Sequence, residues 1–110
     1  MADILSLLTE AILNKKQVLA KYDDLEREMC PHVLGYKDGQ AQCLFYQFAG
    51  ESSKGIYPLD DPNADRNWRC LFLHKLTDVS LRDGPWYSIS RHTRPQTCVD
   101  TVIVEVAGWV

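Results

Sequence analysis

The chain has 110 residues, of which 45% are hydrophobic and 25% charged, and its formal net charge at pH 7 is −3. This balance is typical of one soluble globular domain with a modest core. The negative charge disfavours bulk electrostatic binding to nucleic acid or to an anionic membrane, so any phosphate contact should be local. The N-terminal segment lacks a basic signal-peptide region, and no apolar run reaches the roughly 18 residues of a membrane span. We therefore expect a cytoplasmic protein with no membrane partner.

The N-terminal pattern predicts one amphipathic helix over residues 4–14. Asp3 is a good N-cap, and apolar residues follow it at helical spacing, namely Ile4, Leu5, Leu8, Ala11 and Ile12. A helix this short is not stable by itself in water. We therefore expect Leu8 and Ile12 to be buried against the rest of the domain.

Five or six short strands are expected between residues 17 and 107. A strand starting at Gln17 should turn at Asp23-Asp24 into a strand over 26–30, where Pro31 restricts pairing to an edge or a bulge. A hairpin joined at Lys37-Asp38-Gly39 comes next, and three further strands cover 68–73, 77–82 and 101–107. The prediction is a mostly β (α+β) fold in which a strongly bent sheet closes into a small barrel and the helix caps one end.

A long polar loop over residues 50–67 interrupts this series of strands. It contains Gly55, Pro58 and Pro62 and no regular apolar pattern. Loops of this length in compact domains are usually functional or mobile. We therefore expect a small binding site at the rim of the barrel, where this loop begins and ends.

Residues between 17 and 82 stand in an order that points to one family, beginning with Tyr22, Arg27, Pro31, Leu34, Gly39 and Tyr46. The segment from Trp68 to Val79 then places Arg69, Leu71, Leu73, Leu76 and Val79 on an Arg-x-Phe-x-Leu-x-x-Ile-x-x-Val pattern. In these features the chain resembles the WYL domain, a small Sm-like or SH3-like barrel of bacterial regulators. The Trp-Tyr-Leu triplet that names the family is replaced by Ala41-Gln42-Cys43. The resemblance implies a regulatory module that binds an anionic ligand, often a nucleotide or single-stranded nucleic acid, through arginines on the barrel surface.

Arginines and aromatic residues form the candidate ligand site. Guanidinium groups pair bidentately with phosphate, and aromatic rings stack on nucleobases. Tyr46 and Trp68 flank the long loop, so we expect their rings to be available to a ligand. The alternative is that each arginine pairs separately with a surface carboxylate. The predicted ligand-binding residues are Arg27, Arg66, Arg69, Arg91, Arg94, Tyr46 and Trp68.

The four cysteines are expected to be reduced, and we predict no cofactor and no enzymatic activity. Cys30 and His32 would point to the same side of a strand, with His92 and Cys98 as the remaining ligands of a zinc site. That spacing is poor for tetrahedral zinc, so we predict no bound metal. A thiol nucleophile at Cys98 would lack a recognisable oxyanion hole.

The leading hypothesis is a non-enzymatic module that binds a nucleotide or nucleic-acid ligand. The alternative is a protein–protein adaptor or a dimerisation unit, with a second copy or a regulatory protein as its partner. An exposed apolar patch would favour this alternative.

Overall fold

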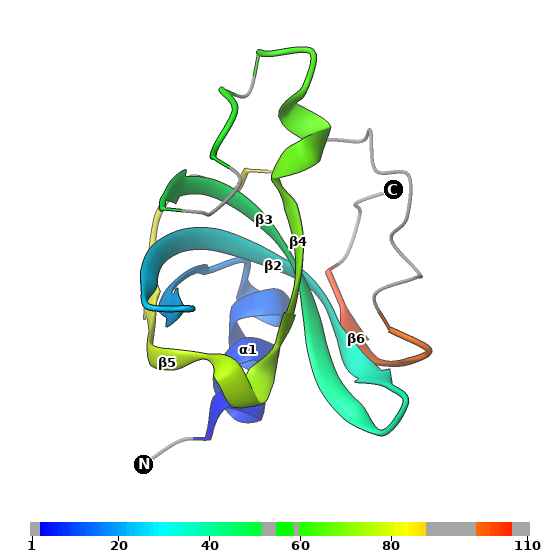
Figure 1. Cartoon of the computed structure of the whole chain (residues 1–110). Helices are drawn as coiled ribbons and strands as arrows, with labels where there is room; N and C mark the ends of the chain where they lie inside the picture. Colours follow the sequence, from blue (N-terminus) through cyan, green and yellow to red (C-terminus); the bar gives the residue numbers. More distant parts are fainter. Residues whose placement is uncertain (1–2, 52–54, 59, 88–98, 107–110) are drawn as a thin grey trace.

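The computed structural model describes residues 3–51, 55–58, 60–87 and 99–106, which form one helix and six strands of an antiparallel sheet (Figure 1). This confirms the mostly β prediction. In chain order the elements are α1 (Ile4–Asn14), β1 (Gln17–Tyr22), β2 (Leu25–Lys37), β3 (Gln40–Gly50), η1 (Ala64–Asn67), β4 (Trp68–Phe72), η2 (Leu73–Lys75), β5 (Thr77–Arg82) and β6 (Thr101–Glu105). The two η elements are single 3₁₀ turns.

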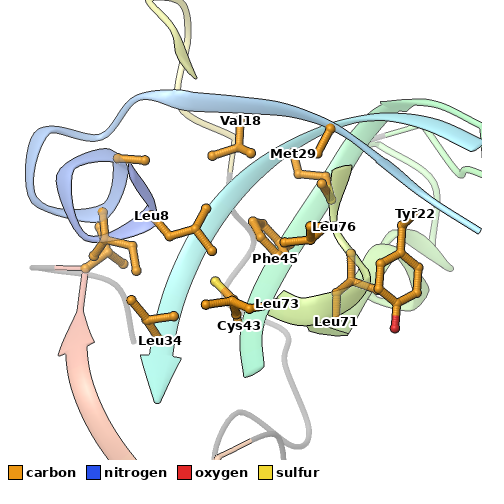
Figure 2. Packing of buried hydrophobic residues seen from close by; sticks show 14 residues of the cluster. Leu8, Val18, Tyr22, Met29, Leu34, Cys43, Phe45, Leu71, Leu73 and Leu76 are labelled. Atoms are coloured by element: carbon orange, nitrogen blue, oxygen red, sulfur yellow. The ribbon is translucent and has the colours of Figure 1, made fainter. Parts of the chain in front are cut away.

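The helix α1 has the predicted bounds and packs on the sheet. It begins where the Asp3 carboxylate accepts the backbone N–H of Ser6 at 2.7 Å, and it ends at Lys15 in a left-handed conformation with φ 51°. Leu8 and Ile12 are buried, as predicted. Figure 2 shows Leu8 reaching from the helix into a cluster of apolar side chains. The strands contribute Val18, Met29, Leu34, Cys43, Phe45 and Leu71, and the turn η2 and its C-cap contribute Leu73 and Leu76.

The long strand β2 changes its neighbour halfway along its length. Its first part pairs with β1, its second part pairs with β6, and β3 lies along its other side. Pro31 lies between the two parts, next to a register shift in the pairing with β3. Proline has no N–H to donate, so it is tolerated where the hydrogen-bond ladder between two strands is interrupted. The strand therefore continues through Pro31 to Lys37, although the sequence predicted an end at Cys30.

The sheet does not close into the predicted barrel within the described residues. Its strand order is β4-β3-β2-β1-β5, with β6 on β2, and the terminal strands β4 and β5 do not pair. The turn η2 carries the chain from one terminal strand to the other, and it places Leu73 and Leu76 in the core. No helix of the described part is long and apolar enough to cross a membrane.

Candidate functional site

Arg27 lies on the inner side of β2 and is almost completely buried. It alternates with the outward-facing Glu26 and Glu28, and it is 4% exposed. Its guanidinium donates from Nη1 to Gln47 Oε1 and from Nη2 to the carbonyl of Tyr22, each at 3.4 Å. It also stands over the Tyr22 ring, with 5.2 Å from Cζ to the centroid. Both hydrogen bonds are longer than the usual N–H···O distance, so the protein stabilises the charge of Arg27 only weakly.

Arg69 lies on β4, opposite Phe45 of β3, and is 8% exposed. Among the described residues it donates to backbone carbonyls, from Nη1 to Arg66 and, at 3.2 Å, to Trp68, and from Nη2 to Gly55 at 3.0 Å. Two of these carbonyls belong to the long loop. Arg69 therefore fastens the loop to the sheet from beneath.

The two guanidinium groups are close enough to influence each other. Burial lowers the pKa of Arg69, and the neighbouring charge of Arg27 lowers it further. Burial also lowers the pKa of Arg27, and the carboxylate of Asp23 opposes this effect. Among the described residues, no carboxylate forms an ion pair with Arg27, and its buried Nε has no hydrogen-bond partner. Both arginine side chains thus face the inner side of the sheet, each with its pKa lowered chiefly by burial.

Gln47 and Asn67, which the sequence did not single out, complete this polar cluster. Both are fully buried. The Gln47 amide donates to the carbonyls of Ala49 and Glu51, and its Oε1 accepts from Arg27. Asn67 binds both the N–H and the carbonyl of Tyr57, at 2.9 and 2.7 Å. The sequence did contain an indication of the role of Gln47. This polar residue follows Cys43 and Phe45 on the same side of β3, where the alternating pattern predicts another apolar residue.

Buried side chains of the sheet and of η1 therefore hold the loop over residues 50–67 at Gly55, Tyr57, Ala64 and Arg66. Arg69 binds its carbonyls, Asn67 binds Tyr57, and the Tyr46 hydroxyl donates to the carbonyl of Ala64 at 3.1 Å. In Figure 1 the loop rises above the upper end of β3 and β4.

The predicted ligand-binding residues do not form one exposed surface. Arg27 and Arg69 are buried, although the family resemblance implied surface positions, because alternation along β2 and β4 turns them inward. Tyr46 is fully buried, so its ring is not available to a ligand, and Trp68 packs edge-on against it with 5.0 Å between ring centroids. Arg66 is exposed. Arg91 and Arg94 lie outside the described residues.

A cavity of about 590 Å³ lies over the outer face of β1, β2 and β5. Two of its basic side chains are already paired, Lys21 Nζ with Asp78 Oδ2 at 3.6 Å and Arg82 Nη2 with Glu28 Oε1 at 2.6 Å. Arg27 also lines this cavity, although the alternation along β2 directs its side chain to the inner face of the sheet.

The cysteine and histidine residues that are described show no metal site. Cys30 is buried, its Sγ accepts the N–H of Tyr87 at 3.3 Å, and burial raises the pKa of its thiol to about 11. The His32 ring contacts Trp68, with 4.7 Å between centroids, and its Nδ1 lies 2.8 Å from the carbonyl of Cys30. No group of three or more potential metal ligands occurs among the described residues. His92 and Cys98 lie outside them.

The expectation that all four cysteines are reduced is wrong at one position. Cys30 and Cys43 are free and buried, whereas Cys70 is disulfide-bonded. Cys70 is exposed on β4, on the opposite side of that strand from the buried Arg69 and Leu71. The oxidised cysteine is thus the accessible one of the three.

No protein-family model, curated protein or solved structure matches this chain. The function is therefore argued from the geometry of the site.

Proposed function

We propose that this chain is a non-enzymatic regulatory module that binds an anionic ligand at the Arg27–Arg69 pair. The resemblance to the WYL domain, which rests on the order of residues, is part of this proposal, because that family couples ligand binding to regulation. A nucleotide or another phosphate-bearing molecule is the ligand class that suits two adjacent guanidinium groups.

The observation that carries the proposal is the state of Arg27. A buried charge that is neither paired nor fully hydrogen-bonded is costly to a folded protein. Arg27 has two long hydrogen bonds and an Nε without an acceptor, and its charge lowers the pKa of Arg69. An anion between the two arginines would accept from Nε and would offset their mutual repulsion.

Isothermal titration calorimetry with a panel of anions tests this proposal. The panel contains phosphate, a nucleoside monophosphate and a short oligonucleotide at fixed ionic strength. We expect at least one of them to bind wild-type protein, to bind Arg27→Gln at least about tenfold more weakly, and to bind Arg82→Gln unchanged. Arg82 is the matched control because it is an arginine of the same sheet that is already paired with Glu28. Equal binding to all three proteins would refute the assignment to Arg27.

The adaptor hypothesis remains a second candidate because apolar side chains are exposed at the other end of the sheet. Tyr36 on β2 and Val102 and Ile103 on β6 are 39%, 47% and 44% exposed, and β2 and β6 pair there. Sedimentation velocity of wild type and Ile103→Lys tests this candidate. A wild-type dimer that the substitution dissociates would favour it, and a monomer at high concentration would exclude self-association.

The proposal places the module in the cytoplasm and requires no membrane. The buried free thiols of Cys30 and Cys43 are compatible with a reducing compartment, where cysteine behaves as a small apolar residue. The disulfide bond of Cys70 would open in that compartment. The anion site does not depend on it, since Cys70 faces away from Arg69.

A further inference from the structure

We infer that His32 is a proton-sensitive latch, which holds residues 83–87 against β2 and releases them when its ring is protonated. The latch is independent of the proposed function, because it needs neither an anionic ligand nor the Arg27–Arg69 pair. It gives a role to a completely buried histidine that anion binding does not use.

His32 lies at the point where β2 changes its neighbouring strand. It is the extra residue of a β-bulge, since the two residues on either side of it are opposite Phe45 and Leu44, which are adjacent on β3. Its carbonyl accepts the N–H of Val106 at 2.8 Å, close to the start of the pairing with β6. A bulge bends its strand and redirects a side chain. The bulge thus sets the direction of the His32 ring.

The His32 ring contacts two tryptophans from different parts of the chain. The Trp68 ring of β4 meets it edge-on with 4.7 Å between centroids, and the Trp86 ring lies tilted against it at 5.0 Å. Two residues earlier on β2, Cys30 Sγ accepts the N–H of Tyr87 at 3.3 Å. These contacts join residues 83–87 to β2 through Trp86 and Tyr87.

A proton added to His32 would place a charge inside this buried contact. Nδ1 lies 2.8 Å from the carbonyl of Cys30. Since a carbonyl only accepts, Nδ1 carries the hydrogen of the neutral ring, and Nε2 takes the added proton. The attraction of an imidazolium for an indole ring is smaller than the cost of removing a charge from water. Protonation therefore weakens the contacts of His32 with both tryptophans.

The described groups on the elements packed around His32 do not offset this cost. Three of them are thiols or phenols, which are uncharged near neutral pH, namely Cys30, Tyr46 and Tyr87. Burial raises the pKa of the Cys30 thiol to about 11, and the charge of Arg82 opposes this rise. The same positive charge would disfavour an imidazolium nearby. The carboxylates are exposed or paired, namely Glu26 and Glu28 on β2, Asp83 in the segment, Asp100 before β6 and Glu105 on β6.

Release of residues 83–87 should therefore become easier in mild acid. A neutral, buried histidine binds fewer protons than the same residue in water, so the released state gains stability as the pH falls below roughly 6.5, where a free histidine titrates. Release takes up one proton. The ratio of released to held segment then rises up to about tenfold for each further pH unit.

Hydrogen exchange measured by NMR on the wild-type protein tests the latch. The protection factor, which is the ratio of intrinsic to observed exchange rate, removes the ordinary effect of pH on exchange. We expect the protection factor of the Tyr87 N–H to fall about tenfold from pH 6.5 to pH 5.5. The protection factors of the β3 amides should stay constant, because the sheet itself does not open. A Tyr87 protection factor that does not change with pH would overturn the inference.

Histidine variants assign the effect to His32. In His32→Gln the Tyr87 protection factor should be constant over this pH range, and a fall equal to that of the wild type would overturn the latch. The matched control is His74→Gln, since His74 is exposed on η2 and its ring contacts Phe72. It should behave as the wild type.

A further variant keeps the test decisive if His32→Gln does not fold. The chain has three histidines, so the double variant His74→Gln, His92→Gln retains His32 alone. We expect the double variant to keep the tenfold fall in Tyr87 protection. Loss of the fall in this variant would show that another histidine controls the segment, and it would overturn the assignment to His32.

Discussion

Arg27 on β2 and Arg69 on β4 both face the inner side of the sheet, and the charge of Arg27 lowers the pKa of Arg69. The two residues are 42 positions apart in the chain, and β3 separates the strands that carry them. Their neighbours differ. Arg69 is bonded to the carbonyls of the loop, whereas Arg27 depends on Gln47 and Tyr22. One arginine therefore serves the fold, and the other is the better candidate for a ligand.

Arg69→Lys should loosen the loop over residues 50–67, because an ammonium cannot reproduce the hydrogen bonds from Nη1 and Nη2 to the carbonyls of Arg66 and Gly55. We expect a loss of about 1–3 kcal/mol in the free energy of unfolding, measured by urea denaturation. Limited proteolysis should cleave the variant faster in this loop. The control is Arg66→Lys, whose side chain is exposed and which should change stability by less than about 0.5 kcal/mol. Similar values for both variants would show that Arg69 does not anchor the loop.

Leu8→Ala should lower the free energy of unfolding by about 2–5 kcal/mol, the usual range for truncating a buried leucine. Leu8 is completely buried between α1 and the sheet. Leu13→Ala on the same helix is the matched control, since Leu13 is 67% exposed and the two variants share the same change in helix propensity. Thermal or urea unfolding measures both. Equal losses would mean that α1 does not bury Leu8 in solution.

Gly50→Ala should destabilise the end of β3 more than Gly39→Ala destabilises the hairpin turn. Both glycines have positive φ, 88° and 79°, so both substitutions incur backbone strain of about 1 kcal/mol. At Gly50 an added Cβ would also lie 2.5 Å from the carbonyl oxygen of Glu26 and 2.8 Å from Arg27 Cα, whereas at Gly39 it would meet nothing within 4 Å. The difference between their urea midpoints isolates the steric contribution. No difference would contradict the close approach of β2 and β3 at Gly50.

The Asp3 cap should make the stability of α1 sensitive to acid. The backbone N–H of Ser6 donates to the Asp3 carboxylate and lowers its pKa from its ordinary value of 3.8. A group whose pKa is lower in the folded state stabilises the fold above its unfolded pKa, and this contribution disappears as the pH falls through the folded pKa. Asp3→Asn keeps an acceptor that does not titrate. Between pH 5 and pH 2, the urea midpoint of the wild type should therefore fall more than that of the variant, and parallel profiles would refute this role.

The sequence predicted the local elements well, because each depends on a short pattern. The helix could be placed from the spacing of its apolar residues after Asp3, and the turns at Asp23-Asp24 and Lys37-Asp38-Gly39 could be placed from residues that tolerate positive φ. The course of β2 through Pro31 could not be predicted in this way, because it depends on the change of the neighbouring strand from β1 to β6. The sequence also did not reveal that the sheet stays open. Whether β4 pairs with β5 depends on the whole sheet, and neither strand's own residues indicate it.

The candidate site was only partly predictable. The two arginines were identified by the family resemblance, but their burial depends on which face of β2 and β4 meets the core. Tyr46 was expected to be accessible, but it is buried. It lies on β3, a central strand, and its hydroxyl donates to the carbonyl of Ala64 in the loop. The side chains of Gln47 and Asn67 form hydrogen bonds with backbone groups, and no pattern in the sequence predicts these partners.

The most direct measurement is a crystal structure of the wild-type protein soaked in sodium selenate, an oxyanion that anomalous scattering locates without ambiguity. We expect an anomalous peak whose oxygens lie within hydrogen-bonding distance of Arg27 Nε, with Gln47 Oε1 no longer the main acceptor of this guanidinium. An Arg82→Gln crystal treated in the same way should show the same peak. A structure with no peak at Arg27, or with Arg27 Nε bonded to a carboxylate of the protein, would contradict the assignment of an anion site to the Arg27–Arg69 pair.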